Sequence, residues 1–444
     1  MSGAVAAHAA YNGSGTQGLA VTNKIQEDDG DVISVYWNKN DTTRQLIYGS
    51  SFVEVPSAGG SGTNNIGTGS NVIFDVNNDI DCLGDIVLKV LFTNTGSDLG
   101  GALETLENQK LAAAVNRVEV QVGTQIWQTF ENADIQALAA TELAKGAYAD
   151  YSFQTSGGVG VDNQFKNGVV DGKIPQDGTA TAYIPLKLFT KTLAPRLENF
   201  AEQTESGYLM GAAPHQQVKI KVYADPTFTL GGASGTLSLS LYAKNQVMCN
   251  EEREQMKAMP AGLPKRIKMT QNKSTTTAAT AGARNVELDL DNFSLYASHL
   301  IISLPKPLDR SVLYNGTAEL LLNSSSFSGK LPLGLLKLTG PGMGLFTNEY
   351  FVAETEASFA RRSAGTYNHD AAKVETTSNT YTFVFPLAGQ QYGGSSVPLN
   401  RFDNIRLKLN LPAGSYGDAT DISVTCVGET TALYKDGAAS LAMY

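Results

Sequence analysis

The sequence has few of the side chains, and none of the short motifs, on which enzyme chemistry commonly depends. Its 444 residues include 4 histidines and 3 cysteines. The HExxH motif, the G-x-S-x-G elbow and the P-loop are absent, which argues against a zinc protease, an α/β-hydrolase and a P-loop nucleotidase. We therefore predict that the protein is not an enzyme, with no catalytic residue, no cofactor and no metal ion.

The cysteines are too few and too scattered to form a disulfide framework. They are Cys82, Cys249 and Cys426, and no two of them form a CxxC pair. Free cysteine is among the most buried residue types, so we expect three unpaired, buried thiols. Unpaired thiols favour synthesis in a reducing compartment.

Long apolar runs and an excess of positive charge are also missing. No segment reaches the roughly 18 apolar residues of a transmembrane helix, and the first residues lack the basic start and apolar run of a signal peptide. The 33 basic residues are outnumbered by 43 acidic ones. Because neutralising phosphates requires Lys and Arg, we expect no direct contact with nucleic acid.

A few residues resemble parts of a site, but each has a simpler structural interpretation. The run Asp75–Asp81 looks like half a calcium loop, yet Ile80 stands where an EF-hand needs glycine. His299 precedes an apolar run and is expected near a strand end, with a hydrogen-bonded ring nitrogen. His369 has an acidic neighbour but lies in a Gly/Asn loop without a nucleophile. We interpret all of them as structural.

Glycosylation is the one modification for which the sequence offers candidates. Asn-x-Ser/Thr sequons occur at Asn12, Asn40, Asn272, Asn292, Asn315 and Asn323. The last four lie in the second half, on expected loops, and are retained as candidate sites. Without a signal peptide, however, the secretory machinery of a host should not reach them.

Strict alternation of apolar and polar residues is the main structural signal that is present. It predicts strands with one buried face. The alternating segments are Val118–Val122, Val218–Val222, Leu237–Leu241, Val286–Leu290, Tyr381–Phe385, Ile405–Leu409 and Ile422–Val427. Val118–Val122 and the following Gly123 predict a hairpin. Ile86–Phe92 is more continuously apolar, and we expect it to be buried on both faces.

Helices are expected only as short insertions between strands. Asn132 can cap a helix through Leu143, where apolar residues recur at spacings of three and four. Two further candidates lie at Asn250–Met256 and Tyr350–Ala360. With 44 glycines to punctuate turns, the pattern is typical of an all-β protein.

The two halves of the chain look alike in outline. Each has a strand ending in a Pro-Leu pair, at Pro185-Leu186 and Pro386-Leu387, followed by a polar loop and a Lys-containing alternating strand. We therefore predict an all-β fold of two tandem eight-stranded jelly rolls with short helical insertions. The expected divisions are an N-terminal arm at 1–27, a first roll at 28–249, a linker at 250–268 and a second roll at 269–444.

Several segments, in one chain order, resemble motifs of a known family. They are Gly84-Asp85 before an apolar run, the hairpin and helix of Asn116–Ala137, Tyr183–Phe189 with the later His215–Ile220, the acidic linker Tyr242–Glu254, and the stretches Tyr381–Asn404 and Leu433–Tyr444. This order resembles the double jelly-roll major capsid proteins of nucleocytoplasmic large DNA viruses. The family's N-terminal motif survives faintly at Ile33–Arg44, and its C-terminal glycines are reduced to Gly437, so the resemblance is to a divergent member.

The resemblance implies a structural role in the virion. Members of this family form homotrimers of pseudo-hexagonal outline, which tile icosahedral facets over an internal membrane. The implied partners are other copies of the chain, neighbouring capsomers, minor capsid and penton proteins, and the inner viral membrane, after synthesis in the host cytoplasm. The insertion Gly146–Gly178 is expected at the tower or at the trimer contact.

Two alternatives stay open at this point. Tandem jelly rolls also occur in glycan-binding and glycan-processing proteins. An enzyme of that kind would need paired carboxylates across a cleft, and Glu354 and Glu356 lie on one expected helix. The other alternative is a minor capsid or spike protein.

Overall fold

The structure, a computed structural model, covers the strands of both halves of the chain. The residues it describes are 24–26, 32–34, 47–58, 65–66, 71–76, 80–95, 114–142, 179–186, 188–189, 207–224, 235–248, 263–280, 282–305, 307–338, 380–387 and 396–442.

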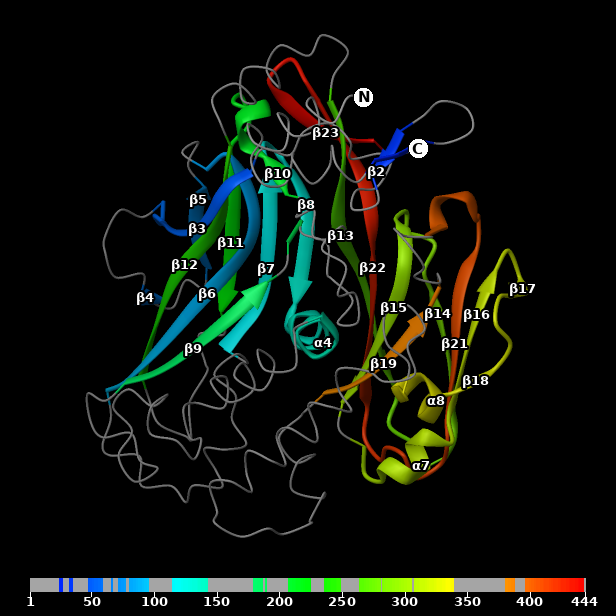
Figure 1. Cartoon of the computed structure of the whole chain (residues 1–444). Helices are drawn as coiled ribbons and strands as arrows, with labels where there is room; N and C mark the ends of the chain where they lie inside the picture. The colour runs from blue at the N-terminus through cyan, green and yellow to red at the C-terminus, as the bar shows by residue number, and fades with distance from the viewer. Residues whose placement is uncertain are drawn as a thin grey trace.

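The first half forms a jelly roll of two antiparallel sheets (Figure 1). The β12 sheet holds, in order, β9 (Thr179–Leu186), β6 (Cys82–Asn94), β12 (Gly235–Met248) and β3 (Ile47–Val55), extended by β4 (Asn65–Ile66) on β12 and β10 (Tyr208–Leu209) on β6. The β11 sheet holds β5 (Asn71–Val76), β11 (Val218–Ala224), β7 (Val115–Val122) and β8 (Gln125–Glu131). A helix, α4 (Asn132–Glu142), follows β8, and a short 3₁₀ turn, η5 (Met210–Ala212), precedes β11.

The second half repeats this arrangement. The β22 sheet holds β13 (Leu263–Thr277), β22 (Thr420–Lys435), β15 (Tyr296–Pro305) and β19 (Thr380–Pro386), extended by β20 (Val397–Pro398) on β15 and β23 (Ala438–Ala442) on β22. The β21 sheet holds β14 (Arg284–Asp289), β21 (Ile405–Leu411), β16 (Thr317–Leu322) and β17 (Ser325–Ser326), with β18 (Leu331–Pro332) also on β16. The helices are α7 (Arg310–Tyr314), α8 (Leu333–Leu338) and the 3₁₀ turn η7 (Leu399–Arg401).

The strand order confirms the expected duplication and the fold of two tandem jelly rolls. Counted along the chain, the first, third, sixth and eighth main strands of each half form one sheet, and the other four form the second. The two Pro-Leu pairs fall at matching places, at the ends of β9 and β19. The Lys-containing strands that follow are the matching strands β11 and β21.

Burial follows the alternation that the sequence shows. Along β11 and β21 every second residue is buried, because each strand turns one face to the core of its roll. The expectation for β6 was wrong: Ile86, Leu88 and Val90 are buried, but Val87 and Lys89 between them are only half-buried. Its second apolar face lies on the outside of the first roll, so apolar composition alone overestimated the burial.

The strand boundaries differ from the expected divisions at two places. Lys24–Gln26 (β1) pairs with Val32–Ser34 (β2) in a separate two-stranded sheet, so 32–34 belongs to neither sheet of the first roll. β13 begins at Leu263, inside the stretch expected to be linker. Its Pro264 is tolerated because β13 is an edge strand, where a missing N–H leaves no ladder bond unmade.

Other expectations fall outside the described residues. They are the helices at 250–256 and 350–360, the insertion 146–178, Cys249, His369, Glu354 and Glu356, the sequons at Asn12 and Asn40, and most of the arm at 1–27. In the part of the chain that the structure describes, no helix is long and apolar enough to cross a bilayer.

The two described cysteines allow a first test. Neither Cys82 nor Cys426 forms a disulfide and both are fully buried, and burial raises the pKa of the Cys426 thiol well above its usual range. A thiol reagent, which attacks the thiolate, should therefore label the native protein slowly. The denatured chain should take up three labels. Rapid labelling of native Cys82 or Cys426, or a mass showing a disulfide, would contradict this expectation.

Candidate functional site

The junction between the two rolls is the most elaborate polar and aromatic site in the described residues. β8 lies beside β13, and α4 lies against β22, β15 and β19 (Figure 1). The outer face of the β22 sheet is covered as a result. Its buried residues include Ile301, Thr382, Val384, Ser423 and Thr425.

Asp134, in the first turn of α4, is the polar centre of the junction. Its carboxylate is buried and accepts hydrogen bonds from the side chains of Asn272 (2.5 Å), Thr425 (2.5 Å) and Ser423 (3.3 Å), all in the second roll. It also accepts one from the backbone N–H of Glu131, 2.9 Å away. One carboxylate therefore caps its own helix and binds β13 and β22.

The helix start differs from the one expected. α4 begins at Asn132, so Asn132 lies in the first turn and does not precede it. Its amide donates to the backbone oxygen of Val115, at 2.8 Å. The capping acceptor is Asp134, which stands at the third position of the helix, where the carboxylate reaches back to the N–H of Glu131.

Burial raises the pKa of the Asp134 carboxyl, and its hydrogen-bond donors oppose that rise. The pKa of Glu131 is also raised, chiefly by burial, with Asp134 and Glu119 adding to it and Arg117 opposing it. Both shifts have the same cause, because the junction removes water from carboxylates near the start of α4.

Further hydrogen bonds join β13 to β8 and to the segment at Leu188 and Phe189. Gln128 is buried; its Nε2 donates to the backbone oxygen of Leu188, and its Oε1 accepts from the hydroxyl of Thr270. The backbone N–H of Lys268 donates to the oxygen of Phe189, at 3.2 Å. β13 is an edge strand of the second roll, and the first roll thus supplies hydrogen-bond partners for part of its unpaired edge.

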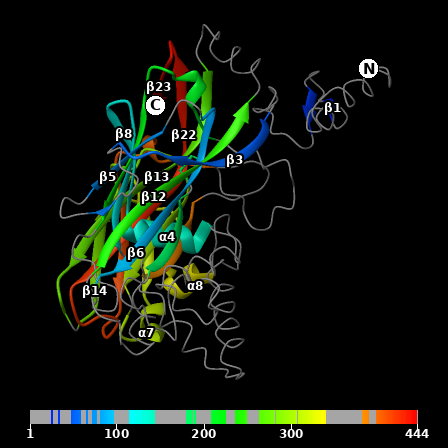
Figure 2. The same ribbon diagram turned by 90° about the vertical axis from the view of Figure 1, so that its left-hand side faces the viewer.

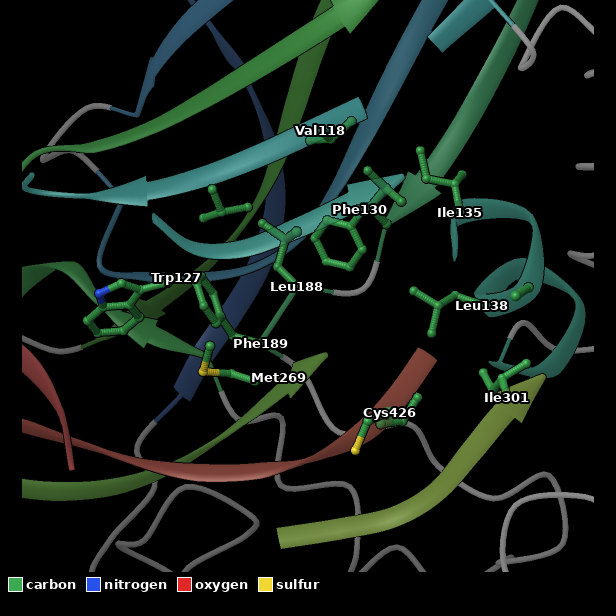
Figure 3. Close-up of a cluster of buried hydrophobic side chains, with 14 of the residues drawn as sticks. Val118, Trp127, Phe130, Ile135, Leu138, Leu188, Phe189, Met269, Ile301 and Cys426 are labelled. Carbon is green, nitrogen blue, oxygen red and sulfur yellow. The ribbon is translucent and has the colours of Figure 1, made fainter. Parts of the chain in front are cut away.

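Aromatic side chains fill the end of the junction that lies near β23. Trp127 packs edge-on against Phe189 and Tyr208, at ring-centroid distances of 6.4 and 5.4 Å. Tyr208 in turn packs on Tyr434 of the second roll, at 5.6 Å, and the Tyr434 hydroxyl accepts from the N–H of Leu209. Met269 of β13 lies beside Trp127 and Phe189 (Figure 3). This cluster buries apolar area from both rolls together.

The hairpin of β22 and β23 closes this same end of the junction. Its two-residue turn is Asp436-Gly437, with φ of 53° and 74°, the conformation that an Asp-Gly turn adopts between two strands. The oxygen of Gly437 accepts from the N–H of His215, and Gln216 accepts from the N–H of Ala439. The turn therefore binds the first roll directly.

The junction is suited to holding the two rolls together. Each oxygen of Asp134 already accepts hydrogen bonds from the protein. Among the described residues no three His, Cys, Asp or Glu side chains gather as metal ligands. Asp75 and Asp81 of the calcium-like run lie at the end of β5 and the start of β6, while 77–79 are outside the described residues.

The candidate residues from the sequence lie in different surroundings. The side chain of Asn272 is half-buried at the junction, and its amide nitrogen, the atom that would carry a glycan, donates to Asp134. Asn292, Asn315 and Asn323 are exposed. His299 is buried within β15, with its Nδ1 2.8 Å from the Ser298 hydroxyl.

Comparison with known proteins shows the fold clearly. No protein-family model and no curated protein matches the sequence. Among solved structures, the chain is similar to VP54 of the virus PBCV-1, in a structure fitted into a reconstruction of the virophage Sputnik, with 13% identity, a TM-score of 0.61 and coverage of 89% of this chain and 97% of that one.

Two further structures agree. A chain of the PBCV-1 virus capsid matches with 14% identity, a TM-score of 0.59 and coverage of 89% and 97%. The Faustovirus major capsid protein matches with 9% identity, a TM-score of 0.50 and coverage of 89% and 94%. The chain therefore has the double jelly-roll fold of viral capsid proteins over nearly its whole length.

Replacing Asp134 by alanine should weaken the junction. The change leaves the donors from Asn272, Thr425 and Glu131 without their acceptor, so we expect a loss of about 2–4 kcal/mol in the free energy of unfolding, measured by chemical denaturation. Asp403→Ala, at an exposed carboxylate, is the matched control and should change stability by less than about 0.5 kcal/mol.

Comparing the wild type with Asp134→Ala over a range of pH also tests the pKa of Asp134. A folded-state pKa raised above the ordinary value of 3.8 means that the folded protein holds this proton more tightly than the unfolded chain. The stability of the protein relative to Asp134→Ala should therefore shrink as the pH rises above about 4. A stability difference that grows with pH over this range would show that the pKa is lowered instead.

The hairpin turn supplies another prediction. A Cβ on Gly437 would lie 2.4 Å from Cδ2 of His215, in a backbone conformation that disfavours side chains, whereas Gly329 has a similar φ of 70° and open space around it. Both Gly437→Ala and Gly329→Ala should lose about 1 kcal/mol to backbone strain. Only Gly437→Ala should lose more, seen as a lower melting temperature, and adding His215→Ala should recover that excess. Equal losses in the two glycine variants would exclude the clash.

Proposed function

We propose that the chain is the major capsid protein of a virus, a divergent relative of those of the nucleocytoplasmic large DNA viruses. The observation that supports this most is the pair of jelly rolls joined by a buried junction, in a fold shared with capsid proteins over 89% of the chain. The role is structural: the protein builds a shell and performs no catalysis.

The proposed building block is a homotrimer. Three copies supply six rolls around a threefold axis, which gives a capsomer of pseudo-hexagonal outline, and such capsomers tile an icosahedral shell over an internal membrane. Neighbouring capsomers, minor capsid and penton proteins and the inner membrane are the proposed partners. Synthesis in the host cytoplasm and assembly into the virion follow from this proposal.

The buried junction suits this role. A shell subunit must keep the relative position of its two rolls while it makes contacts with its neighbours. Here the hydrogen bonds of Asp134 and Gln128 and the tilted packing of Tyr208 against Tyr434 join the rolls at separate points. A pair of rolls held at several points acts as one body in assembly.

Glycosylation of the second roll stays a proposal with a preferred order of sites. Asn292, Asn315 and Asn323 are exposed, whereas Asn272 is half-buried at the junction, where its amide donates to Asp134. If the protein is glycosylated, the sugar should lie on the three exposed residues and not on Asn272.

The oligomeric state tests the proposal. Light scattering behind a sizing column should give a mass near three chains of 47.1 kDa across a hundredfold dilution, because a capsomer needs a large obligate interface, on the order of 2,000 Å² or more. A chain that stays monomeric or dimeric at micromolar concentration would contradict the capsomer and favour the glycan-binding alternative.

A further inference from the structure

A row of hydroxyl groups crosses the face of the β22 sheet that the first roll covers. Ser303 of β15 pairs with Thr382 of β19 on one side and with Ser423 of β22 on the other. Side chains of directly opposite residues lie on the same face of a sheet, so the three hydroxyls lie in line across three strands. Ser303 and Thr382 are each 2% exposed, and Ser423 is 7% exposed. The row is therefore removed from bulk water.

The row lies under α4. Ser423 donates to the carboxylate of Asp134, at 3.3 Å, which identifies the face of the sheet. Ile301, two residues before Ser303 and so on the same face, lies on the side of β15 toward α4 and Leu138 (Figure 3). α4 packs against β19 as well. Viewed from the side of the first roll, β6 and β12 lie in front of α4 (Figure 2), so the first roll shields the row.

Two of the three hydroxyls bind nothing within the part of the chain that the structure describes. Neither Ser303 Oγ nor Thr382 Oγ1 has a hydrogen-bond partner there, and both atoms are buried. A buried hydroxyl without a partner lowers the stability of a protein, because it has given up its hydrogen bonds to water. Two such groups on adjacent strands therefore indicate a ligand between them.

The other buried serine and threonine hydroxyls of the described residues all have partners in the protein. Their acceptors are a side-chain amide, backbone oxygens and the Asp134 carboxylate, and the residues are Thr270, Ser415, Thr420, Ser423 and Thr425. The two exceptions, Ser303 and Thr382, are direct neighbours in the sheet. The missing bonds are thus concentrated at one place on the face that α4 covers.

The spacing of the row suits a water molecule. Opposite residues on neighbouring strands have Cβ atoms about 4.5–5.5 Å apart, and two hydrogen bonds of about 2.8 Å through one water span up to about 5.6 Å. Hydroxyls and water each donate and accept, so they can pair in either direction. A buried water typically makes about three hydrogen bonds. Ser303, Thr382 and Ser423 supply that number, because Ser423 can still accept while it donates to Asp134.

A neutral ligand fits this site better than a cation. The three hydroxyls carry no charge, and both oxygens of Asp134 already accept hydrogen bonds from the protein. The helix residue three positions after Asp134 is Ala137, which is fully buried and lies on nearly the same side of α4. Its methyl group occupies less space than the side chain of Leu138 next to it, as a small ligand between helix and sheet requires.

We propose that an internal water molecule binds Ser303, Thr382 and Ser423 and extends the hydrogen-bond network of Asp134 across the sheet. α4 is then linked to β22 directly and to β15 and β19 through this water. The water is a structural ligand of the junction, and the inference does not depend on the proposed role in a capsid, because it concerns a contact within one chain.

The isosteric variant Thr382→Val tests the proposal in solution. If a water binds here, valine removes one of its partners, and the folded-to-unfolded ratio from chemical denaturation should fall about tenfold. If the hydroxyl is dry and unpartnered, valine should leave that ratio unchanged or raise it, which would overturn the proposal.

Val384→Thr is the matched control. Val384 lies two residues further along β19 on the same face, is 2% exposed and pairs with Ile301 instead of a hydroxyl. Threonine there buries a hydroxyl among apolar groups, so the ratio should again fall about tenfold. Losses for both opposite exchanges would show that a hydroxyl is favoured only where the row provides polar neighbours.

A double variant tests whether one water serves both hydroxyls. Ser303→Ala combined with Thr382→Val should reduce the ratio by clearly less than the product of the two single losses, because each change disturbs the same water. Losses that multiply would assign the two hydroxyls to separate partners and contradict the shared site.

A crystal structure of the full chain at about 1.8 Å shows the ligand directly. We expect one density peak at about 2.6–3.2 Å from the hydroxyl oxygens of Ser303, Thr382 and Ser423, and its loss in the double variant. The absence of a peak in the wild type would overturn the proposal. So would a peak with five or more oxygen ligands at about 2.4 Å, which is the coordination of a hard cation and not of water.

Discussion

The burial of one carboxylate between two sheets is the constraint on which the rest of the molecule depends. Asp134 leaves water only because β13 and β22 supply donors for it. A buried charge without such partners is strongly unfavourable, so the carboxylate tolerates few other placements of the second roll. The aromatic cluster around Trp127 and Tyr208 supplies apolar burial, and Asp134 restricts the register in which that burial occurs.

Local patterns in the sequence predicted the strands and their duplication, because alternation and turn residues act over a few positions. The β7–β8 hairpin and the strands β11 and β21 follow directly from such patterns. The junction could not be predicted in this way: Asp134 bonds Asn272 and Thr425, which lie 138 and 291 residues further along the chain. An acidic residue in the first turn of a helix indicates a cap, but nothing nearby indicates its distant partners. The β13 boundary was missed because Pro264 reads as a linker signal unless the strand is known to be at an edge.

The two rolls show how one fold can serve different surroundings. Their strand order is the same, and the hairpins that carry Trp127 and Phe327 have the same register. What differs is the surroundings of the outer faces: the face of the β22 sheet is buried under the first roll, whereas the face of the β21 sheet carries the exposed ion pair Arg406–Glu287. Backbone geometry thus persists through the repeat, while side-chain chemistry assigns each face to water or to a partner.

The long separation within the junction also affects how the chain is made. A ribosome adds about 5–20 residues per second, and domains fold in order from the N-terminus. The 291 residues between Asp134 and Thr425 therefore correspond to a delay of about 15–60 s. During that interval the first roll can complete its own sheets, but α4 and Trp127 still face water. The nascent chain passes through a state with an exposed aromatic surface and an unshielded carboxylate, which is where a chaperone would act and where premature association would begin.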